Sequence, residues 1–468
     1  MQVTIIGSGY VGLTTGVALA YLGHQVTLLD KNPAVVSALV KGSCTIYEYG
    51  MDELMQSARH NISFTTSFAG IGSSRVILIA VGTPPKSSGD ADLGFVENAV
   101  AQIAGHLDGT NYPVIVNKST VPPGTASRVK TLVNNILLGK GIYSGVKVAS
   151  NPEFLREGTA FLDALYPDRI IIGAEDRSTT EVLIELYNPI IKQSFTAPAC
   201  LPRPKGYAGP VLFATNPLNA ELIKYASNAF LAMKISFINE FAGLAELLNA
   251  DIVDVAYGMG LDSRIGDKFL RAGVGWGGSC FGKDARAILY TAQKYGYSLP
   301  LVQAAIEVND RQKKLVTSKI RSSLKTIPGS TIGIIGLAFK PGTDDCRETP
   351  ATDLISELLN MGAFIKVYDP MAMENYQKQN PGLPVEYAAD LADLAAGCDA
   401  LVLLTEWEQF KNADWQSLRQ LMKKNVFIDG RNLFDPRVMD ELGFVYHGVG
   451  RRVRVKGHTA VADSKALS

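Results

Sequence analysis

The segment Gly7–Gly12, read as GSGYVG, constrains the fold of this chain more than any other feature. It follows a short apolar run, Val3–Ile6, and opens a helical pattern over Tyr10–Leu22. Asp30 closes the next apolar run, Gln25–Asp30. Glycines at this spacing let a pyrophosphate approach a helix N-terminus, and an acid about 20 residues on accepts ribose hydroxyls. The pattern predicts a Rossmann-like domain that binds a dinucleotide, and the negative charge of Asp30 favours NAD over NADP. A tight strand–helix turn without a ligand is the alternative.

Size and charge narrow the class of protein. A chain of 468 residues is long enough for two to four domains. Its 45 basic and 45 acidic residues cancel, which gives no electrostatic reason to bind nucleic acid or anionic lipid. The N-terminus lacks the pattern of a signal peptide, and no apolar stretch is long enough to span a membrane. The five cysteines are far apart and predict neither a metal site nor disulfides, so the expected location is the cytoplasm.

Strand and helix patterns divide the chain into four parts. Residues 1–200 alternate short apolar runs with helices and predict the NAD-binding domain. Residues 215–325 are helical and begin with a long apolar helix, Asn219–Asn249, expected to connect domains or form a dimer core. The Pro- and Gly-rich stretch Thr196–Pro217 before it is interpreted as a connection or an inserted loop. Residues 329–447 form a second α/β domain, and the basic, then small and polar tail 448–468 is expected to be mobile.

The segment Gly275–Asp284, read as GWGGSCFGKD, places Cys280 before a helical run, Phe281–Tyr295. A helix N-terminus lowers the pKa of a thiol and favours the nucleophilic thiolate. Asp284 lies one helical turn further on, so a nucleophile and an acid/base would share one face. A small buried cysteine beside a capping aspartate is the alternative.

Polar residues also follow strands of the first domain. Val81–Pro84 and Lys118–Pro122 each end an apolar run, and ligands of open α/β sheets bind at such ends. Glu153 follows another strand and is a candidate for positioning water, although an isolated glutamate is more often solvated. Lys224 and Asn228 share a face of the long helix, either as an interfacial pair or as joint stabilisers of an oxyanion.

The second α/β domain carries no glycine fingerprint. In its place stands GLAFKPGTDDCRETP, in which Lys340 and Arg347 are able to meet phosphates, and Arg431 follows a later strand. A sheet of this kind suggests a nucleotide ligand other than a dinucleotide.

Together these motifs resemble the UDP-glucose/GDP-mannose dehydrogenase family over nearly the whole chain. The matching pieces are VGTPP, KSTVPPGT, SNPEFLREGTA, KYASNAFLAMKISFINE, SRIGDKFLRAGVGWGGSCFGKD, GLAFKPGTDDCRETP, VYDP, LTEWEQF and IDGRNLFDP, in family order. The resemblance implies an α/β fold with two Rossmann-like doubly wound domains joined by a central helical domain that contains one long helix.

The resemblance implies an NAD-dependent, four-electron oxidation of UDP-glucose to UDP-glucuronate without release of the aldehyde. Cys280 would hold the intermediate as a thiohemiacetal and then a thioester. Lys224 and Asn228 would stabilise developing oxyanions, while Asp284 and Glu153 handle protons and the hydrolytic water, which Thr120 helps to hold. The first general base stays open between a lysine of depressed pKa and a water held by Asp284.

Binding residues carry over from the same resemblance. Those expected at NAD are Gly7, Gly9, Tyr10, Val11, Gly12, Asp30, Val81, Gly82, Thr83, Pro84, Thr120, Glu157, Lys283 and Arg347. Those expected at the nucleotide sugar are Glu153, Phe154, Leu155, Arg156, Lys224, Asn228, Arg264, Phe269, Leu270, Arg271, Ala272, Gly273, Gly277, Phe339, Lys340 and Arg431. Arg264 is expected to reach the partner subunit's site in a homodimer or higher oligomer, and no metal is expected.

Two other functions remain open from the sequence. Within the same family, the substrate could instead be UDP-N-acetylmannosamine, UDP-N-acetylglucosamine or GDP-mannose. In a different class, the chain could be a non-catalytic scaffold that binds NAD and a nucleotide, but its retained Cys280, Lys224, Asn228 and Asp284 argue against that.

Overall fold

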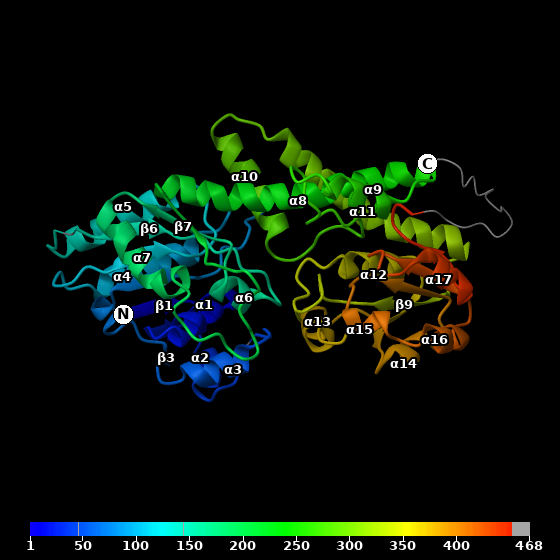
Figure 1. The fold of residues 1–468 in the computed structure, drawn as a ribbon, viewed down its shortest axis with the longest axis horizontal. Coiled ribbons are helices and arrows are strands. Elements are labelled where there is room, and N and C mark those ends of the chain that lie inside the picture. Colours follow the sequence, from blue (N-terminus) through cyan, green and yellow to red (C-terminus); the bar gives the residue numbers. More distant parts are fainter. Residues whose placement is uncertain (45, 144, 452–468) are drawn as a thin grey trace. The chain divides into compact units, whose positions relative to one another are not determined.

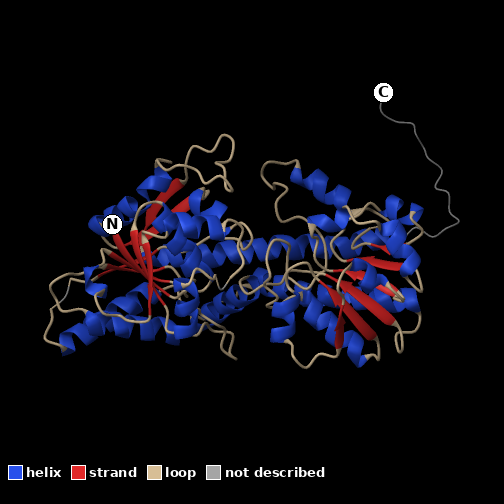
Figure 2. Ribbon diagram, turned by 90° about the horizontal axis from the view of Figure 1, so that it is seen from below, coloured by secondary structure: helices blue, strands red, loops and turns tan. Residues whose placement is uncertain are grey.

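The computed structural model describes residues 1–44, 46–143 and 145–451, which form two compact units (Figure 1). Unit 1 comprises Met1–Phe230 and Ser279–Gln303. Unit 2 comprises Leu231–Gly278 and the described chain from Ala304 onward. Each unit is built on one β-sheet with helices on both of its faces (Figure 2).

Unit 1 contains an eight-stranded sheet of order β3-β2-β1-β4-β5-β6-β7-β8. Its strands are β1 (Gln2–Ile6), β2 (Gln25–Leu29), β3 (Ile62–Thr65), β4 (Val76–Ile79), β5 (Val114–Asn117), β6 (Lys147–Ser150), β7 (Arg169–Ala174) and β8 (Val211–Thr215). Its helices before residue 200 are α1 (Tyr10–Tyr21), α2 (Pro33–Val40), α3 (Met51–Ala58), α4 (Gly94–His106), α5 (Thr125–Gly139), α6 (Ala160–Leu165) and α7 (Arg177–Ile191), with a 3-10 turn at Ile71–Ser73.

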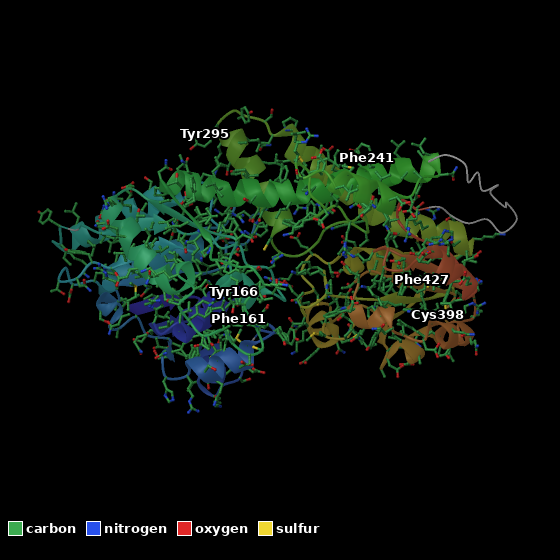
Figure 3. All side chains as sticks on the ribbon, viewed as in Figure 1. Phe161, Tyr166, Phe241, Tyr295, Cys398 and Phe427 are labelled. Carbon is green, nitrogen blue, oxygen red and sulfur yellow. The ribbon has the colours of Figure 1, made fainter. Side chains whose placement is uncertain are left out.

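Alternate residues of the central strands enter two different cores. Val76 and Leu78 of β4 pack in the same cluster as α1, α3, α6 and α7, whereas Ile77 and Ile79 pack with α4 and α5. Successive strand residues point to opposite faces, so a strand buried on both faces reads as a continuous apolar run. The buried aromatic Phe161 belongs to the first of these clusters (Figure 3).

This sheet differs in two ways from the expected one. It is not entirely parallel, and the segment expected to be a connection contains a strand. Strand β7 pairs antiparallel with β6, and β8 then runs parallel to β7. Strand β8 falls inside Thr196–Pro217, which was interpreted as a connection. Its side chains are half-buried or exposed because it lies at the sheet edge, so it lacks the apolar run that marks the central strands.

Unit 2 contains a parallel six-stranded sheet of order β11-β10-β9-β12-β13-β14. Its strands are β9 (Thr331–Ile335), β10 (Phe364–Tyr368), β11 (Val385–Tyr387), β12 (Ala400–Leu403), β13 (Val426–Asp429) and β14 (Val445–His447). Its helices after residue 325 are α12 (Pro350–Asn360), α13 (Met373–Gln379), α14 (Leu391–Ala395), α15 (Glu408–Lys411), α16 (Trp415–Leu421) and α17 (Pro436–Glu441). The strand order repeats that of the first six strands of unit 1, so this is a second doubly wound domain.

Four further helices lie between the two sheets in sequence. They are α8 (Pro217–Leu248), α9 (Ile252–Gly260), α10 (Phe281–Lys294) and α11 (Pro300–Leu324). The 32 residues of α8 are one uninterrupted helix that contributes to both units. None of the helices within the described ranges is long and apolar enough to cross a membrane. Of the tail, residues 448–451 are described, and the backbone amide of Gly450 donates to Glu246, whereas 452–468 lie outside the described residues.

Candidate active site

The glycine turn of unit 1 leaves the start of α1 open. Gly7 has a positive φ of 99°, and a Cβ on Gly12 would lie 1.8 Å from the carbonyl oxygen of Gly7. No described side chain caps the N-terminus of α1, and no described atom lies within 4 Å of where a Gly9 side chain would project. Free helix amides beside open space suit an anionic pyrophosphate.

Asp30 stands directly beside this turn. Its carboxylate accepts hydrogen bonds from the Ser8 amide at 2.8 Å, the Ser8 hydroxyl at 2.6 Å and the Asn32 amide at 2.9 Å. Burial raises the pKa of Asp30, but these donors and Lys31 outweigh it, and the net shift is downward. Asp30 is therefore a carboxylate at neutral pH.

Tyr10 links the glycine turn to the loop that follows β6. Its hydroxyl donates to Glu48, and the same Glu48 carboxylate accepts from the amides of Gly158 at 2.7 Å and Ala160 at 2.8 Å. Glu48 is buried, and sequence analysis did not select it. Glu48 stands between two tyrosines in the segment IYEY. That local pattern does not indicate that its carboxylate caps the start of α6.

The catalytic candidates of unit 1 gather around the start of α10. Cys280 is the N-cap residue of that helix, and the Asp284 amide donates to the Cys280 carbonyl at 2.9 Å. The buried Asp284 carboxylate accepts from Asn228 of α8 at 2.6 Å and pairs with the Lys283 ammonium at 2.6 Å. A thiol and a carboxylate therefore lie one turn apart, as the spacing predicts.

Lys224 and Glu153 form a buried ion pair with 3.0 Å between ammonium and carboxylate. Burial lowers the pKa of Lys224, but Glu153, Asp284 and Cys280 outweigh it and raise the net value. Lys224 is therefore not a lysine of depressed pKa, which was one of the two candidates for the first general base. Burial likewise raises the pKa of Glu153, and Lys224 and the Leu155 amide reverse it, so Glu153 is held as a carboxylate.

The thiol of Cys280 has a raised pKa, contrary to the expectation from its helix-start position. Part of the Cys280 residue is exposed to solvent, but its sulfur is surrounded by protein. The resulting loss of hydration raises the pKa of the thiol. The carboxylates of Glu153 and Asp284 raise it further, while Lys224 lowers it. Burial and two negative charges outweigh the helix terminus, so the thiol stays protonated at neutral pH until a base takes its proton.

Residues expected at NAD also meet near this cluster. The Thr83 hydroxyl donates to the Thr120 carbonyl at 2.9 Å, and Lys283 lies 3.4 Å from the same hydroxyl. Val81 accepts a hydrogen bond from Ser119 at 2.6 Å, which joins the loops after β4 and β5. Gly82 and Pro84 stand in the first of these loops.

The loop after β6 carries four more candidates, and their partners differ. Phe154 stacks under Arg169, whose guanidinium lies 3.9 Å from the ring centroid, and Lys224 lies 5.1 Å from that centroid. Arg156 pairs with Asp163 at 2.6 Å, within its own loop and helix. Leu155 donates its amide to Glu153 at 2.5 Å, and Glu157 lies between Arg156 and the capped start of α6.

Lys118 is a buried cation that sequence analysis left without a role. It directly follows β5, and its ammonium donates to Asn151 at 3.0 Å and to the Tyr187 hydroxyl at 3.4 Å. Burial lowers its pKa to about 8, with Lys224 acting in the same direction and Glu153 opposing. The signal in the sequence was a lysine placed at the end of the short, mostly apolar run VIVN.

In unit 2, the segment Phe269–Gly277 is held by buried amide side chains. The Gly273 amide donates to Asn239 at 2.8 Å, Gln312 donates to the Gly273 carbonyl at 2.7 Å, and Asn309 bonds both backbone groups of Trp276. Phe269 has a positive φ of 65°, Leu270 and Ala272 are buried, and Arg271 is exposed. A Cβ on Gly277 would lie 2.4 Å from the Glu348 carbonyl, so this segment packs closely on the loop after β9.

Arg431 ties together loops at the carboxyl end of the second sheet. Its guanidinium donates to the carbonyls of Leu404 at 2.7 Å, Gly275 at 3.2 Å and Phe339 at 3.2 Å. The Lys340 ammonium lies 5.6 Å from the Phe339 ring. Phe339, Lys340 and Arg431 are thus brought together with the Phe269–Gly277 segment.

Two arginines expected at ligands are engaged with nearby acids. Arg347 forms ion pairs with Asp345 at 2.6 Å, and Arg264 with Asp262 at 2.6 Å. Both side chains are exposed.

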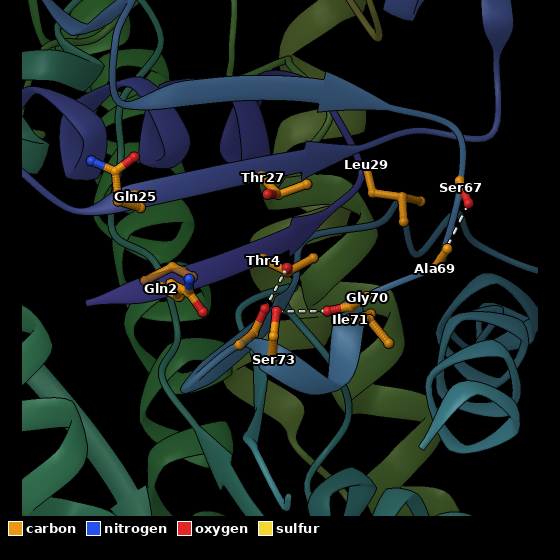
Figure 4. Close-up of a pocket in the computed structure, with 12 residues that line it drawn as sticks. Gln2, Thr4, Gln25, Thr27, Leu29, Ser67, Ala69, Gly70, Ile71 and Ser73 are labelled. Carbon is orange, nitrogen blue, oxygen red and sulfur yellow. Dashed lines mark hydrogen bonds between the residues drawn. The ribbon is translucent and has the colours of Figure 1, made fainter. Parts of the chain in front are cut away.

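A separate hollow of about 140 Å³ lies along β1 and β2 (Figure 4). Its walls include Thr4, Thr27 and Ser73, and no candidate site residue lines it. The chemistry is therefore assigned to the loops at the carboxyl ends of the strands. Within the described ranges, no group of three or more His, Cys, Asp or Glu side chains is arranged to hold a metal ion.

Comparison with known proteins agrees with this arrangement. Three models of the UDP-glucose/GDP-mannose dehydrogenase family match in order: the NAD binding domain over residues 1–191, the central domain over 218–311 and the UDP binding domain over 333–436.

Whole-chain relatives give the same answer. The chain is 42% identical to UDP-glucose 6-dehydrogenase TuaD of Bacillus subtilis, covering 96% of this chain and 93% of that protein. It is 43% identical to UDP-glucose 6-dehydrogenase of Rhizobium meliloti, covering 96% and 100%. Among solved structures, the UDP-glucose dehydrogenase of Pyrobaculum islandicum matches with a TM-score of 0.84 at 35% identity, covering 96% of this chain and 98% of that one. The chain therefore belongs to the UDP-glucose/GDP-mannose dehydrogenase family, whose NAD binding, central and UDP binding domains it carries in order.

Proposed function

We propose that this protein oxidises UDP-glucose to UDP-glucuronate with two NAD⁺, through a thioester on Cys280. The observation that carries the proposal is the meeting of Cys280, Asp284 and Asn228 with the buried Lys224–Glu153 pair in unit 1. The 42% and 43% identical relatives named above support UDP-glucose as the substrate. The proposal includes a cytoplasmic location, because a thiol nucleophile has to stay reduced to react.

The residues of unit 1 fit NAD. The open start of α1 suits the pyrophosphate, and the Asp30 carboxylate beside it would accept ribose hydroxyls. When bound, NAD⁺ supplies the two-electron acceptor for each oxidation. The loops that contain Thr83 and Thr120 would face it, together with Lys283 in the first turn of α10.

The first oxidation needs a base for the hydroxyl proton on C6. Lys224 is held protonated, so its role is to stabilise negative charge on the C6 oxygen together with the Asn228 amide. A water held by Asp284 is the base that this arrangement favours.

Covalent capture and hydrolysis follow. The Cys280 thiol gives its proton to a neighbouring base, and its sulfur bonds to the aldehyde carbon as the C=O π bond opens. The former carbonyl oxygen takes up a proton, which gives a thiohemiacetal. A second two-electron oxidation gives a thioester, and water then breaks the carbon–sulfur bond, supplying the second carboxylate oxygen and restoring the thiol. In this proposal Glu153, the partner of Lys224, takes a proton from that water, and Thr120 helps to hold it.

The decisive test is NADH formation with a panel of nucleotide sugars. UDP-glucose should give two NADH per molecule consumed, without free aldehyde. Preference for UDP-N-acetylmannosamine, UDP-N-acetylglucosamine or GDP-mannose would replace the substrate but keep the chemistry. No reduction with any of them would favour a non-catalytic scaffold.

NAD should be preferred over NADP by at least about tenfold in kcat/KM, which corresponds to ~1.4 kcal/mol. The physical reason is that the Asp30 carboxylate, ionised at neutral pH, repels a 2′-phosphate. Steady-state kinetics with each cofactor measure the ratio. A ratio near one would remove Asp30 from the ribose site.

The proposal includes assembly into at least a homodimer. Four apolar side chains on α8 within unit 2 are exposed at helical spacing: Phe237, Phe241, Leu244 and Leu248. The rings of Phe237 and Phe241 lie 4.7 Å apart, and Phe241 stands on the outside of the helix (Figure 3). An apolar helix face of this kind is typical of a protein interface. Arg264, exposed after α9, would serve the partner's site.

Phe241→Asp should shift the protein to a smaller species in light scattering at micromolar concentration, because a charge would be buried in the apolar interface. Leu138→Asp is the matched control, since Leu138 is an exposed apolar residue of α5 in unit 1. A wild-type monomer with full activity would refute both the interface and the role of Arg264.

A further inference from the structure

Lys118 is a buried lysine beside the candidate site, and the proposed mechanism assigns it no role. Its side chain is almost fully buried, and its ammonium bonds to two neutral acceptors, Asn151 and Tyr187. An ammonium surrounded by neutral partners is costly to bury unless negative charge compensates it. The carboxylate that acts on it is Glu153.

Asn151 connects Lys118 mechanically to Glu153. It is the first residue after β6, two positions before Glu153 in the same loop. Its side-chain oxygen accepts from Lys118 and from Tyr187 at 2.5 Å, and its side-chain nitrogen donates to the Ile171 carbonyl of β7 at 2.7 Å. Three hydrogen bonds therefore hold the Asn151 side chain, and they fix the start of the loop that carries Glu153.

Lys118 and Glu153 also interact electrostatically. Glu153 is held ionised by Lys224 first and by Lys118 in addition. The titratable groups acting on Lys118 are Glu153 from the loop after β6 and Lys224 from α8, and Tyr187 of α7 bonds to it.

We propose that Lys118 is a positioning residue for this reaction: its ammonium anchors Asn151 and supplies a second buried positive charge that keeps Glu153 ionised. This inference rests on the proposed function, in which Glu153 takes a proton from the hydrolytic water. Lys118 itself touches neither the thiol nor the substrate carbon in this scheme.

The test compares pH profiles of kcat for wild type, Lys118→Gln and Tyr187→Phe. Removing a neighbouring positive charge raises the pKa of a carboxylate, so the acid limb of Lys118→Gln should move to higher pH than that of wild type. The KM for UDP-glucose should change less than twofold. Tyr187→Phe breaks the same hydrogen-bond network but keeps the ammonium, so its acid limb should stay with wild type. Lys118→Met replaces Lys118→Gln if the latter does not fold.

Two results would overturn the proposal. One is an acid limb of the Lys118 variant that coincides with wild type. The other is an equal shift in Tyr187→Phe, which would make the effect structural rather than electrostatic.

A second measurement works without turnover and separates this inference from the proposed function. The pKa of Lys118 is about 8 in the fold and about 10.4 in an unfolded chain. Between these values the unfolded chain binds more protons, so wild-type stability should rise with pH relative to Lys118→Gln. Urea midpoints from pH 7.5 to 10 measure the difference. If wild type fails to oxidise UDP-glucose, the proposed function is wrong. Parallel urea midpoints would instead show that folding does not lower the pKa of Lys118, so that it is not the desolvated cation on which this inference depends.

Discussion

Cys280→Ser is expected to abolish conversion of UDP-glucose to UDP-glucuronate. A serine hydroxyl is a far poorer nucleophile than a thiol near neutral pH, and it would have to hold both the thiohemiacetal and the thioester. Chromatography of the products, together with NADH formation, measures the loss. Turnover near the wild-type rate would show that the covalent mechanism is wrong.

The control for this variant is Cys44→Ser. Cys44 is a half-buried free cysteine that packs against the core of unit 1, away from the start of α10. It should keep its activity, which would separate loss of the nucleophile from a general effect of removing a thiol.

The fold was predictable because its central strands are buried on both faces. The apolar run Val3–Ile6 lies in β1, Gln2–Ile6, and the long helix expected over Asn219–Asn249 is α8, Pro217–Leu248. The direction of β7 was not predictable, because it depends on pairing with β6 rather than on local pattern. The edge strand β8 was missed for a related reason: its exposed side chains carry no apolar run.

The candidate site was predictable in its residue types but not in its electrostatics. The local rule of the helix N-terminus predicted a lowered pKa for Cys280, whereas burial and the carboxylates of Glu153 and Asp284 raise it. Glu153 comes from a distant part of the chain, so sequence spacing does not reveal its proximity. Lys118 was overlooked for the same reason, since its partners follow β6 and lie on α7.

Lys224→Ala should lower kcat by two or more decades, on the scale of ~3 kcal/mol for one lost oxyanion donor. The ammonium acts mainly as negative charge develops on the sugar oxygen, so the apparent KM should move much less. Arg431→Ala should show the opposite balance, with the larger effect on KM, because it holds three segments of unit 2 in place. Steady-state kinetics of both variants measure the two effects, and Lys234→Ala on the same helix is the control.

Stability has to be separated from chemistry in the Lys224 variant. Its removal leaves the buried Glu153 carboxylate without its 3.0 Å partner, and breaking a buried ion pair costs about 3–5 kcal/mol. A folded variant, checked by circular dichroism at the assay temperature, is therefore required before kcat is interpreted. In such a variant the pKa of Glu153 rises, so the loss of kcat should be greatest at low pH and shrink as pH increases, without reaching wild type. If instead KM rises alone and kcat is unchanged at every pH, Lys224 only binds substrate or supports Glu153, and the oxyanion belongs to Asn228.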